Sequence, residues 1–327
     1  MARKRDRSRN VKEKEPFDLC KKYRPQSLDD FLGNSALKRT LQKAVEDDKI
    51  SHTILFDGDR GCGKTSLARI LANELGCSQL DYREINAADF GGIDTSRQII
   101  RTMRTSPMKG KYKVFLLDEV HMLGQGGDSA KNKAQTAMLK AFEEPPKHVF
   151  FFLCTTEPGN VLGTIKSRCI RHTVKPLVPK VTMELVTGIA KKEGVELPKQ
   201  VATRIAKYSQ GIAREAVKML EQVIFLSESD MLEVSFQMDQ TESNVKELCN
   251  CIWYGKSWAE TAKVLRALKD DPEGVRRRMR GWFAAILLNG DQRAWMVLDT
   301  FQKPYFNTDG KNQLVRDTYE CWSELNQ

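Results

Sequence analysis

The stretch GDRGCGKTS, from Gly58 to Ser66, has residue types and a spacing suited to binding phosphate. Gly58, Gly63, Lys64 and Thr65 fit the pattern G-x-x-x-x-G-K-[ST], and the stretch lies between an apolar run and a helical pattern, as that mechanism requires. Glycines let backbone amides turn toward phosphate oxygens, the lysine reaches the β and γ phosphates, and the threonine can ligate Mg²⁺. The positive end of a helix beginning near Lys64 adds to this attraction. The stretch therefore predicts a nucleotide site.

Two acids could supply the metal ligand and the base that nucleotide hydrolysis requires. In KVFLLDEVH, four apolar residues precede Asp118 and Glu119. A strand there would place Asp118 at its carboxyl end beside the phosphate loop, where it could hold Mg²⁺ through water, with Glu119 as the candidate base. The alternative is an ordinary strand end with two surface acids, and the complete phosphate loop upstream favours the catalytic interpretation.

A second strand-like run, HVFFFLCTTEP, ends in Thr155 and Thr156. Either hydroxyl could help to orient water at the γ phosphate, and either could equally cap a loop. We favour Thr156 as the orienting residue.

Two arginines could also contact phosphate. Arg168, in TIKSRC, follows a strand and a short loop, so it could reach a neighbouring subunit's γ phosphate, where such a finger is worth about 10³ to 10⁵ in rate. Arg214, in GIAREAVKML, lies in the first turn of a helical pattern, where a cation is disfavoured by roughly 0.3 to 1 kcal/mol unless an anion binds there. The alternative for each is a plain surface arginine.

The elements that must position these residues alternate along the first half of the chain. Apolar runs at 52–56, 113–117 and 148–153 alternate with helix-like segments, which is typical of a parallel sheet covered by helices. One helix is expected after the phosphate loop with Gly76 as its stop, and another over 131–144, closed by Pro145.

Beyond Pro176 the strand-like runs disappear, and three helical patterns follow over 181–194, 197–211 and 212–226. The rest of the chain is helical in pattern. The predicted fold class is α/β, with helical domains after it. The predicted organisation is a basic disordered tail (1–16), an α/β nucleotide domain (17–178), a small helical lid (179–235) and an all-α C-terminal domain (236–327).

The 327 residues carry a formal charge of +10, with a pI near 9.1, which favours polyanionic partners and nucleic acid first. Much of this excess lies in residues 1–16, which could equally be a solvated arm. No apolar run reaches the roughly 18 residues of a membrane span, and the start of the chain lacks the apolar core of a secretory signal. We expect a soluble cytoplasmic protein with no membrane partner.

The eight cysteines are scattered, and we expect free thiols in a reducing compartment. Cys249 and Cys251 could form half a metal site, but no second Cys or His pair is nearby. Two side chains on a helix are the favoured interpretation.

Together these residues resemble the AAA+ ATPases, and more narrowly the ATP-hydrolysing subunits of sliding-clamp loaders. The segments that carry the resemblance to the bacterial gamma/tau family are KKYRPQSLDDFLGN, HTILFDGDRGCGKTSLARILANELGC, LLDEVHML, AFEEPPKHVFFFLCTTEP and SRC. The resemblance is strong from about residue 20 to 178 and weaker through the lid. It implies a AAA+ domain, a lid and a C-terminal collar.

The resemblance also implies roles for single residues. The adenine side would be lined by Cys20, Lys21, Lys22, Tyr23 and Leu32. The phosphates would be wrapped by Gly58, Gly61, Cys62, Gly63, Lys64, Thr65 and Ser66. Thr65 and Asp118 would hold Mg²⁺, and Glu119 would activate water. Thr156 would be the first sensor, Arg214 the second, and Arg168 the finger acting in trans.

Two departures from the bacterial pattern stand out. Bacterial gamma/tau subunits carry a cysteine-rich zinc module after the helix of the phosphate loop, whereas ELGCSQLDYREINAAD keeps only Cys77, so we expect no zinc. The sequence also lacks a long extension after the collar-like region. In both respects it resembles the large subunits of phage loaders and the small subunits of replication factor C, so the expected setting is a bacterial or phage-infected cell.

The function implied by the resemblance is ATP-driven loading of a ring clamp onto primer-template DNA during replication. Copies of the chain and other loader subunits would form an open ring or spiral with ATP sites shared between neighbours. One alternative is a AAA+ motor that translocates on DNA, of the branch-migration helicase type. Another is an architectural loader subunit that does not hydrolyse ATP, against which Gly63, Lys64, Asp118 and Glu119 argue.

Contacts with DNA and clamp are less well defined. Arg97, Arg101 and Arg104 recur at helical spacing and could follow phosphates, although a solvated face is an equal interpretation, and FGG (90–92) replaces polar residues expected there. Ile100, Met103 and Met108 could press into a clamp pocket or pack in the core. In RRRMRGW (276–282) we expect a solvated basic face and an apolar face in the collar, and the alternative is a DNA-binding role.

Overall fold

The apolar runs form the middle of a parallel sheet. The computed structural model describes residues 17–90, 93–123, 128–268, 271–305 and 309–326. The strands are β1 (Thr53–Asp57), β2 (Tyr82–Asn86), β3 (Lys113–Asp118), β4 (Val149–Thr155) and β5 (Ile170–Thr173), in the order β2-β3-β4-β1-β5. All neighbouring strands are parallel, so their carboxyl ends meet at one edge. The predicted α/β class with a parallel sheet is confirmed.

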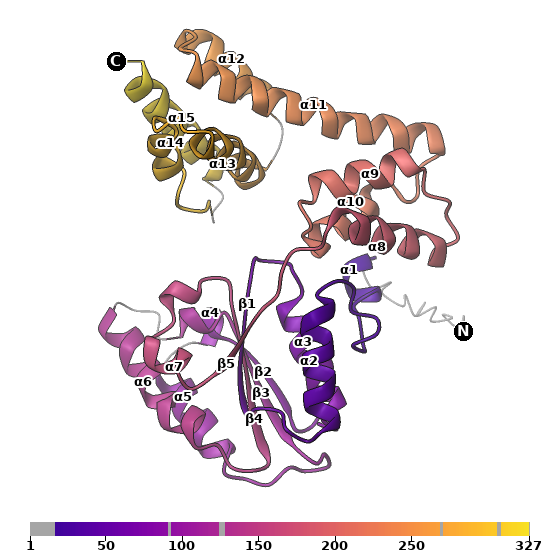
Figure 1. Cartoon of the computed structure of the whole chain (residues 1–327), viewed down its shortest axis with the longest axis vertical. Coiled ribbons are helices and arrows are strands. Elements are labelled where there is room, and N and C mark those ends of the chain that lie inside the picture. The colour runs from indigo at the N-terminus through magenta and orange to yellow at the C-terminus, as the bar shows by residue number, and fades with distance from the viewer. Residues whose placement is uncertain (1–16, 91–92, 124–127, 269–270, 306–308, 327) are drawn as a thin grey trace, which may run out of the picture. The chain divides into compact units, whose positions relative to one another are not determined.

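Helices cover both faces of the sheet (Figure 1). One face carries α2 (Ser35–Glu46) and α3 (Lys64–Glu74). The other carries α5 (Ile93–Thr102), α6 (Asp128–Glu143) and the short α7 (Gly163–Lys166), with α4 (Ala87–Phe90) after β2. Short 3-10 turns follow β3 (Val120–Met122) and β4 (Pro158–Asn160).

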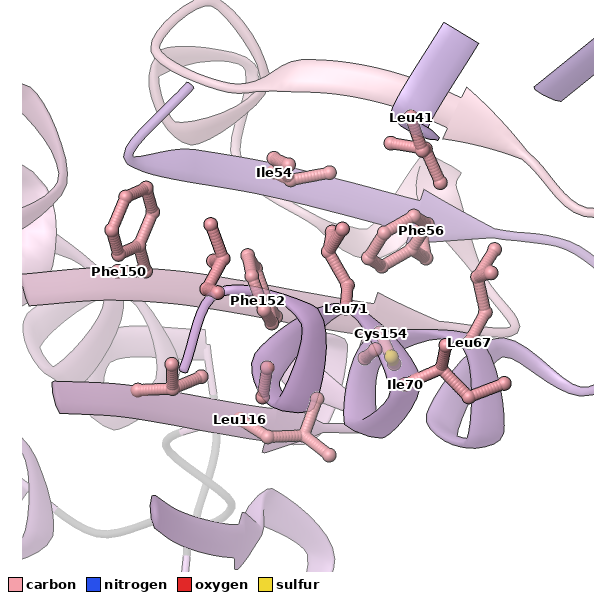
Figure 2. Packing of buried hydrophobic residues seen from close by; sticks show 14 of the residues in the cluster. Leu41, Ile54, Phe56, Leu67, Ile70, Leu71, Leu116, Phe150, Phe152 and Cys154 are labelled. Carbon is pink, nitrogen blue, oxygen red and sulfur yellow. The ribbon is translucent and has the colours of Figure 1, made fainter. Parts of the chain in front are cut away.

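Each central strand supplies side chains to two cores because successive residues point to opposite faces. Ile54 and Phe56 pack with Leu67 and Leu71 of α3, as Figure 2 shows, whereas Leu55 belongs to the cluster of α5 and α6. These central strands are buried along almost their whole length, as expected for a parallel sheet covered on both sides. The packing fixes the carboxyl ends of β1, β3 and β4 as one rigid edge.

The two outer strands were not predicted. Residues of β2 and β5 are mostly exposed or half-buried, and neither strand contains a continuous apolar run. Edge strands of this kind are held by ladder hydrogen bonds to a neighbour, which a hydrophobic pattern does not reveal.

Three helices follow the sheet: α8 (Pro179–Lys192), α9 (Lys199–Tyr208) and α10 (Ala213–Val223). They coincide with the three helical patterns expected after Pro176. Together with the sheet and the short N-terminal helix α1 (Leu19–Lys22) they lie in the first of two compact units, which ends at Phe225.

The second compact unit, Leu226–Gln327, is helical. It contains α11 (Glu228–Trp253), α12 (Trp258–Ala267), α13 (Pro272–Leu288), α14 (Ala294–Thr300) and α15 (Gly310–Leu325) around a core that includes Leu248, Phe283 and Phe301. The predicted boundary between lid and collar, at 235–236, falls inside α11. The division into three domains stays a prediction, and the tail 1–16 lies outside the described residues.

One expectation about this unit is wrong. The basic face of RRRMRGW is not wholly solvated, because Arg276 is buried. Its guanidinium donates to both carboxylate oxygens of Glu273 (2.7 Å each) and to the Phe301 carbonyl (2.6 Å). The charge is tolerated inside because these acceptors satisfy it. Arg276 therefore has a structural role.

Within the described ranges, no helix has both the length and the apolar character needed to cross a membrane. All eight cysteines are free thiols.

Candidate nucleotide-binding site

The loop between β1 and α3 has a backbone that only glycines suit. Gly58, Gly61 and Gly63 have φ of 145°, 85° and 101°, which L side chains rarely adopt. A Cβ at Gly58 would lie 2.3 Å from the Val174 carbonyl oxygen, and one at Gly63 would lie 2.9 Å from the ring of Phe31. Gly63 also forms the N-cap of α3, so the helix begins at Lys64 as the motif predicts. This backbone fits the predicted phosphate loop.

The ammonium group of Lys64 is directed back over the loop. The side chain is buried, and its Nζ donates to the carbonyl oxygens of Gly58 (2.8 Å) and Asp59 (2.9 Å). Phosphate oxygens bound in the loop would compete with these neutral acceptors for a full positive charge, and charge-assisted bonds are the stronger ones. The lysine is therefore already placed at the loop that it is expected to serve.

Thr65 and Asp118 come together as the expected metal pair. The Thr65 hydroxyl donates to Asp118 Oδ2 at 2.8 Å, which joins the first turn of α3 to the end of β3. A hydroxyl and a carboxylate are hard oxygen ligands, the kind that Mg²⁺ takes, usually together with water and substrate phosphates. The pair fits Mg²⁺, which would supply charge neutralisation at the phosphates when bound.

Glu119 stands next to this pair in a backbone conformation unusual for its residue type, with φ 49°. Its Oε2 accepts hydrogen bonds from the backbone N–H (3.1 Å) and the hydroxyl (2.9 Å) of Thr156. The expected base and the favoured orienting residue are thus in direct contact at the ends of adjacent strands. Thr155, the other candidate, is buried.

His121 lies beneath this contact and was not among the predicted site residues. It is buried, with Nδ1 2.9 Å from the Thr155 hydroxyl and 3.4 Å from Glu119 Oε2. The only sequence signal was its place in LDEVHML, two residues after Glu119.

The lid contacts the phosphate loop directly. Arg214, exposed at the start of α10, donates its backbone N–H to the Gly61 carbonyl at 3.4 Å, and a Cβ at Gly61 would lie 2.8 Å from Ile212. The arginine predicted as second sensor therefore stands at the loop, at the helix end where an anion compensates its charge.

The residues expected at the adenine side belong to α1 and the segment after it. The Cys20 thiol faces the Arg214 carbonyl (3.8 Å), and Lys22 forms an ion pair with Glu193 of the lid (2.6 Å). This carboxylate raises the pKa of the Tyr23 hydroxyl. Lys21 is exposed and Leu32 half-buried. These contacts hold α1 against the lid, and the role of the segment at the adenine stays a prediction.

Arg168 does not reach the phosphate loop of its own chain. Its Nε donates to Glu143 Oε2 of α6 at 2.9 Å, and its Nη1 donates to the Thr164 carbonyl at 2.8 Å. The arginine lies just before β5, which is an outer strand of the sheet. This position agrees with a finger for another subunit, a role that stays a prediction.

An ion pair under the loop was also missed by sequence analysis. Asp57, the last residue of β1, is buried and accepts two hydrogen bonds of 2.9 Å from Arg171 of β5, with a further one from Thr173 at 3.1 Å. The Arg171 guanidinium holds the pKa of this carboxyl below its usual range. The pair ties the strand before Gly58 to the strand after Arg168. The sequence signal that could have identified Asp57 was its position directly before Gly58.

No group of three or more His, Cys, Asp or Glu that could hold a metal ion occurs in the part of the chain that the structure describes. Cys249 and Cys251 are buried in α11. The expected lack of zinc stays a prediction.

The three residues predicted to contact the clamp, Ile100, Met103 and Met108, differ in how far they are buried. Met103 is buried and Ile100 packs against the core, whereas 75% of Met108 is exposed. Core packing thus accounts for Ile100 and Met103. Arg97, Arg101 and Arg104 are exposed, Arg97 in an ion pair with Asp94, and most of FGG lies outside the described residues.

A phosphate loop after β1, acids at the end of β3, hydroxyls at the end of β4 and three helices against the loop form the arrangement that the resemblance to AAA+ P-loop proteins leads one to expect. The fold is that of the Thermotoga maritima RuvB Holliday junction branch migration motor, with a TM-score of 0.54, 20% identity and coverage of 74% of this chain and 85% of that one.

Sequence comparison identifies nearer relatives. A family model described as DNA polymerase III, delta subunit, matches residues 33–89 and 81–178. The DNA polymerase III subunit gamma/tau of Mycobacterium tuberculosis (H37Rv) is 34% identical over 229 residues, 63% of this chain and 38% of that protein. Subunit tau of Bacillus subtilis (168) is 35% identical over 237 residues, 66% of this chain and 41% of that protein.

Subunit gamma of Buchnera aphidicola (strain Bp) is 30% identical over 236 residues, 66% of this chain and 62% of that protein. The chain is thus similar to DNA polymerase III gamma/tau subunits, which confirms the resemblance expected from its motifs. It spans less than two thirds of the length of these relatives.

Proposed function

We propose that this chain is an ATP-hydrolysing subunit of a sliding-clamp loader, acting in DNA replication in a bacterial or phage-infected cell. One observation carries the chemistry: Thr65, Asp118, Glu119 and Thr156 meet at the sheet edge beside the phosphate loop. The similarity to DNA polymerase III gamma/tau subunits supports the biological setting.

The chain's own residues divide the work of hydrolysis. The loop amides and Lys64 would bind the phosphates, Thr65 and Asp118 would hold Mg²⁺, and Glu119 would take a proton from the attacking water. Glu119 must first exchange its hydrogen bonds from Thr156 for water, and the Thr156 hydroxyl is then free to orient that water. Arg214 would contact the γ phosphate from the lid.

Three further contacts are proposed for the assembly. Arg168 would leave Glu143 and reach the γ phosphate bound by a neighbouring copy or another loader subunit, so that ATP holds an open ring or spiral together. Exposed Met108 would contact the clamp, and a basic inner surface would follow the backbone of primer-template DNA without reading its sequence.

The decisive experiment measures ATP hydrolysis with primer-template DNA and with candidate ring clamps, each alone and then combined. A clamp loader is stimulated most when both are present. No extra effect of the clamp would contradict clamp loading.

A second candidate, a motor that translocates on DNA, is favoured by the likeness to the RuvB branch migration motor. The same experiment separates the two, because a translocating motor responds to DNA length and does not need a clamp. An architectural subunit that does not hydrolyse ATP would show no turnover in any arm.

A further inference from the structure

Asn34 adopts a backbone conformation that is energetically unfavourable for most residues other than glycine. Its φ and ψ are 47° and 39°, in the left-handed region, and it stands at the N-cap of α2. Asparagine at an N-cap normally accepts a hydrogen bond from the first turn, which is worth about 1 kcal/mol. Here the side chain makes no such bond. Its side-chain amide forms hydrogen bonds with another part of the chain.

The amide of Asn34 clasps one residue of the segment that leads to the lid. Its Nδ2 donates to the Lys175 carbonyl at 3.0 Å, and its Oδ1 accepts the Lys175 N–H at 2.9 Å. Both backbone groups of Lys175 are thereby held by the α/β domain, as a neighbouring strand would hold them.

Two residues further on, the same segment is held by the lid. The Leu177 N–H donates to the Gly211 carbonyl at 2.8 Å, and a Cβ at Gly211 would lie 2.2 Å from the Leu177 carbonyl oxygen. Pro176, whose ring fixes its own φ, is the one residue between the two attachments. The freedom of the lid on this segment is therefore confined to very few torsions.

The chain also passes between the lid and the α/β domain in the segment from α1 to α2. That segment ends at Asn34. The α1 helix is attached to the lid, since the Leu19 N–H donates to Glu221 (3.1 Å) and Lys22 pairs with Glu193 (2.6 Å). The chain then returns to the sheet and begins α2 after Asn34. The clasp on Lys175 thus joins the end of one crossing to the start of the other.

We infer that Asn34 is a positioning residue of the hinge: by clasping Lys175 it sets the angle at which the lid presents Arg214 to a nucleotide in the phosphate loop. This inference rests on the proposed function, because it takes Arg214 to contact the γ phosphate. An arginine held at the wrong angle loses its contact with ATP while ADP, which lacks that phosphate, is bound as before.

The test uses two substitutions of Asn34 and one matched control in the whole chain. Asn34→Gly keeps the left-handed backbone and removes the amide. Asn34→Asp keeps the acceptor for the Lys175 N–H and loses the donor. The control, Asp48→Gly, changes another left-handed residue (φ 52°) just beyond the other end of α2, away from the lid.

Two quantities are measured: hydrogen exchange at the Lys175 amide without nucleotide, and dissociation constants for ATP and ADP with Mg²⁺. We expect Asn34→Gly to speed exchange at Lys175 at least about fivefold, since its hydrogen-bond partner is gone, while the Leu177 amide is unchanged. We expect the preference for ATP over ADP to fall about threefold to tenfold, because the competent lid angle is less populated. Asn34→Asp should lie between, and Asp48→Gly should match the wild type.

Unchanged exchange at Lys175 in Asn34→Gly would overturn the clasp. Faster exchange with an unchanged preference for ATP would overturn its positioning role. If the wild-type chain binds no ATP, the proposed function fails and this role with it, and the exchange at Lys175 still reports separately whether the clasp exists.

Discussion

At the residue scale, the chemistry of this site depends on what holds the Glu119 carboxylate. In the structure one of its oxygens accepts both the backbone N–H and the hydroxyl of Thr156. A carboxylate held in this way is placed at the strand ends without being fixed to the metal pair of Thr65 and Asp118. If Glu119 is the base that we propose, release from Thr156 is the step that exposes it to water.

Replacing Glu119 by glutamine tests that role. Glu119→Gln keeps the shape and an acceptor for Thr156 but removes the proton acceptor, so turnover should fall about 10²- to 10⁴-fold, the usual contribution of a general base. ATP affinity should stay within about twofold, because binding depends on the loop and Lys64. The control is Glu157→Gln, a neighbouring carboxylate 4.0 Å from His121 that we place outside the chemistry. Undiminished hydrolysis in Glu119→Gln would remove the residue from its proposed role.

The ion pair of buried Asp57 with the half-exposed Arg171 predicts a pH dependence of stability. The pKa of Asp57 is lowered in the folded protein, mainly by the hydrogen bonds from Arg171. A lowered pKa gives stability that is fully present above the unfolded value of about 3.9 and is lost as the pH falls through the lower folded value. Wild type should therefore exceed Asp57→Asn in free energy of unfolding by a constant amount from neutral pH down to about pH 5, and the gap should shrink below about pH 4. Denaturant titrations across this range measure it, and a gap that widens in acid would contradict the assignment.

Sequence motifs predicted the residues that meet at the sheet edge, because each follows an apolar run or the glycine pattern. Lys64, Thr65, Asp118 and Thr156 are of this kind. Asp57 and Arg171 could not be paired in advance, since they lie 114 positions apart and only the adjacency of β1 and β5 brings them together. The same holds for Asn34 and Lys175.

At the element scale, the first turn of the phosphate loop has its shape because Val174, directly after β5, leaves no room beside it. Gly58 has φ 145°, and a Cβ there would lie 2.3 Å from the Val174 carbonyl oxygen, a backbone atom that cannot move aside alone. The chain can pass from β1 into the loop before α3 with this backbone only if residue 58 is glycine.

Gly58→Ala should therefore unfold or distort the loop, at a cost of about 3 kcal/mol or more for the strained backbone and the contact together. The matched control is Gly76→Ala at the end of α3, which has φ 75° but no atom within 4 Å of its Cβ, and should lose only about 1 to 2 kcal/mol. Thermal unfolding and ATP binding of the two variants measure the difference. Equal losses would show that conformation alone, and not contact with Val174, sets the glycine requirement.

Helices and strands with a strong apolar pattern could be predicted from the sequence. Strands that are stabilised mainly by backbone pairing with a neighbouring strand could not. The three central strands, α3 and α6 coincide with apolar runs or helical spacing. Strands β2 and β5 were not predicted because their side chains are mostly polar and at least partly exposed. Their extended conformation is set by backbone pairing with β3 and β1. The long helix α11 also shows why a domain boundary is hard to place, since nothing in its pattern changes at 235–236.

At the scale of the whole molecule, the proposed function predicts that a nucleotide site on one copy is completed by an arginine from another. Arg168 is bound to Glu143 and Thr164 of its own chain, at the start of an outer strand and away from its own phosphate loop. If the proposal is right, an active interface needs Glu119 from one subunit and Arg168 from the next.

Mixing two inactive variants tests this sharing. Glu119→Gln and Arg168→Ala should each bind ATP with nearly wild-type affinity and each hydrolyse it slowly in the assembled complex. In an equal mixture, an interface is active when the loop belongs to an Arg168→Ala copy and the finger to a Glu119→Gln copy, so random assembly restores about a quarter of the interfaces. Steady-state hydrolysis at equal total protein measures the recovery. The control mixes Glu119→Gln with the chain carrying both substitutions, which provides no complete interface and should show no recovery. If the first mixture stays as slow as its components, although the subunits assemble, Arg168 acts within its own chain and the composite site is wrong.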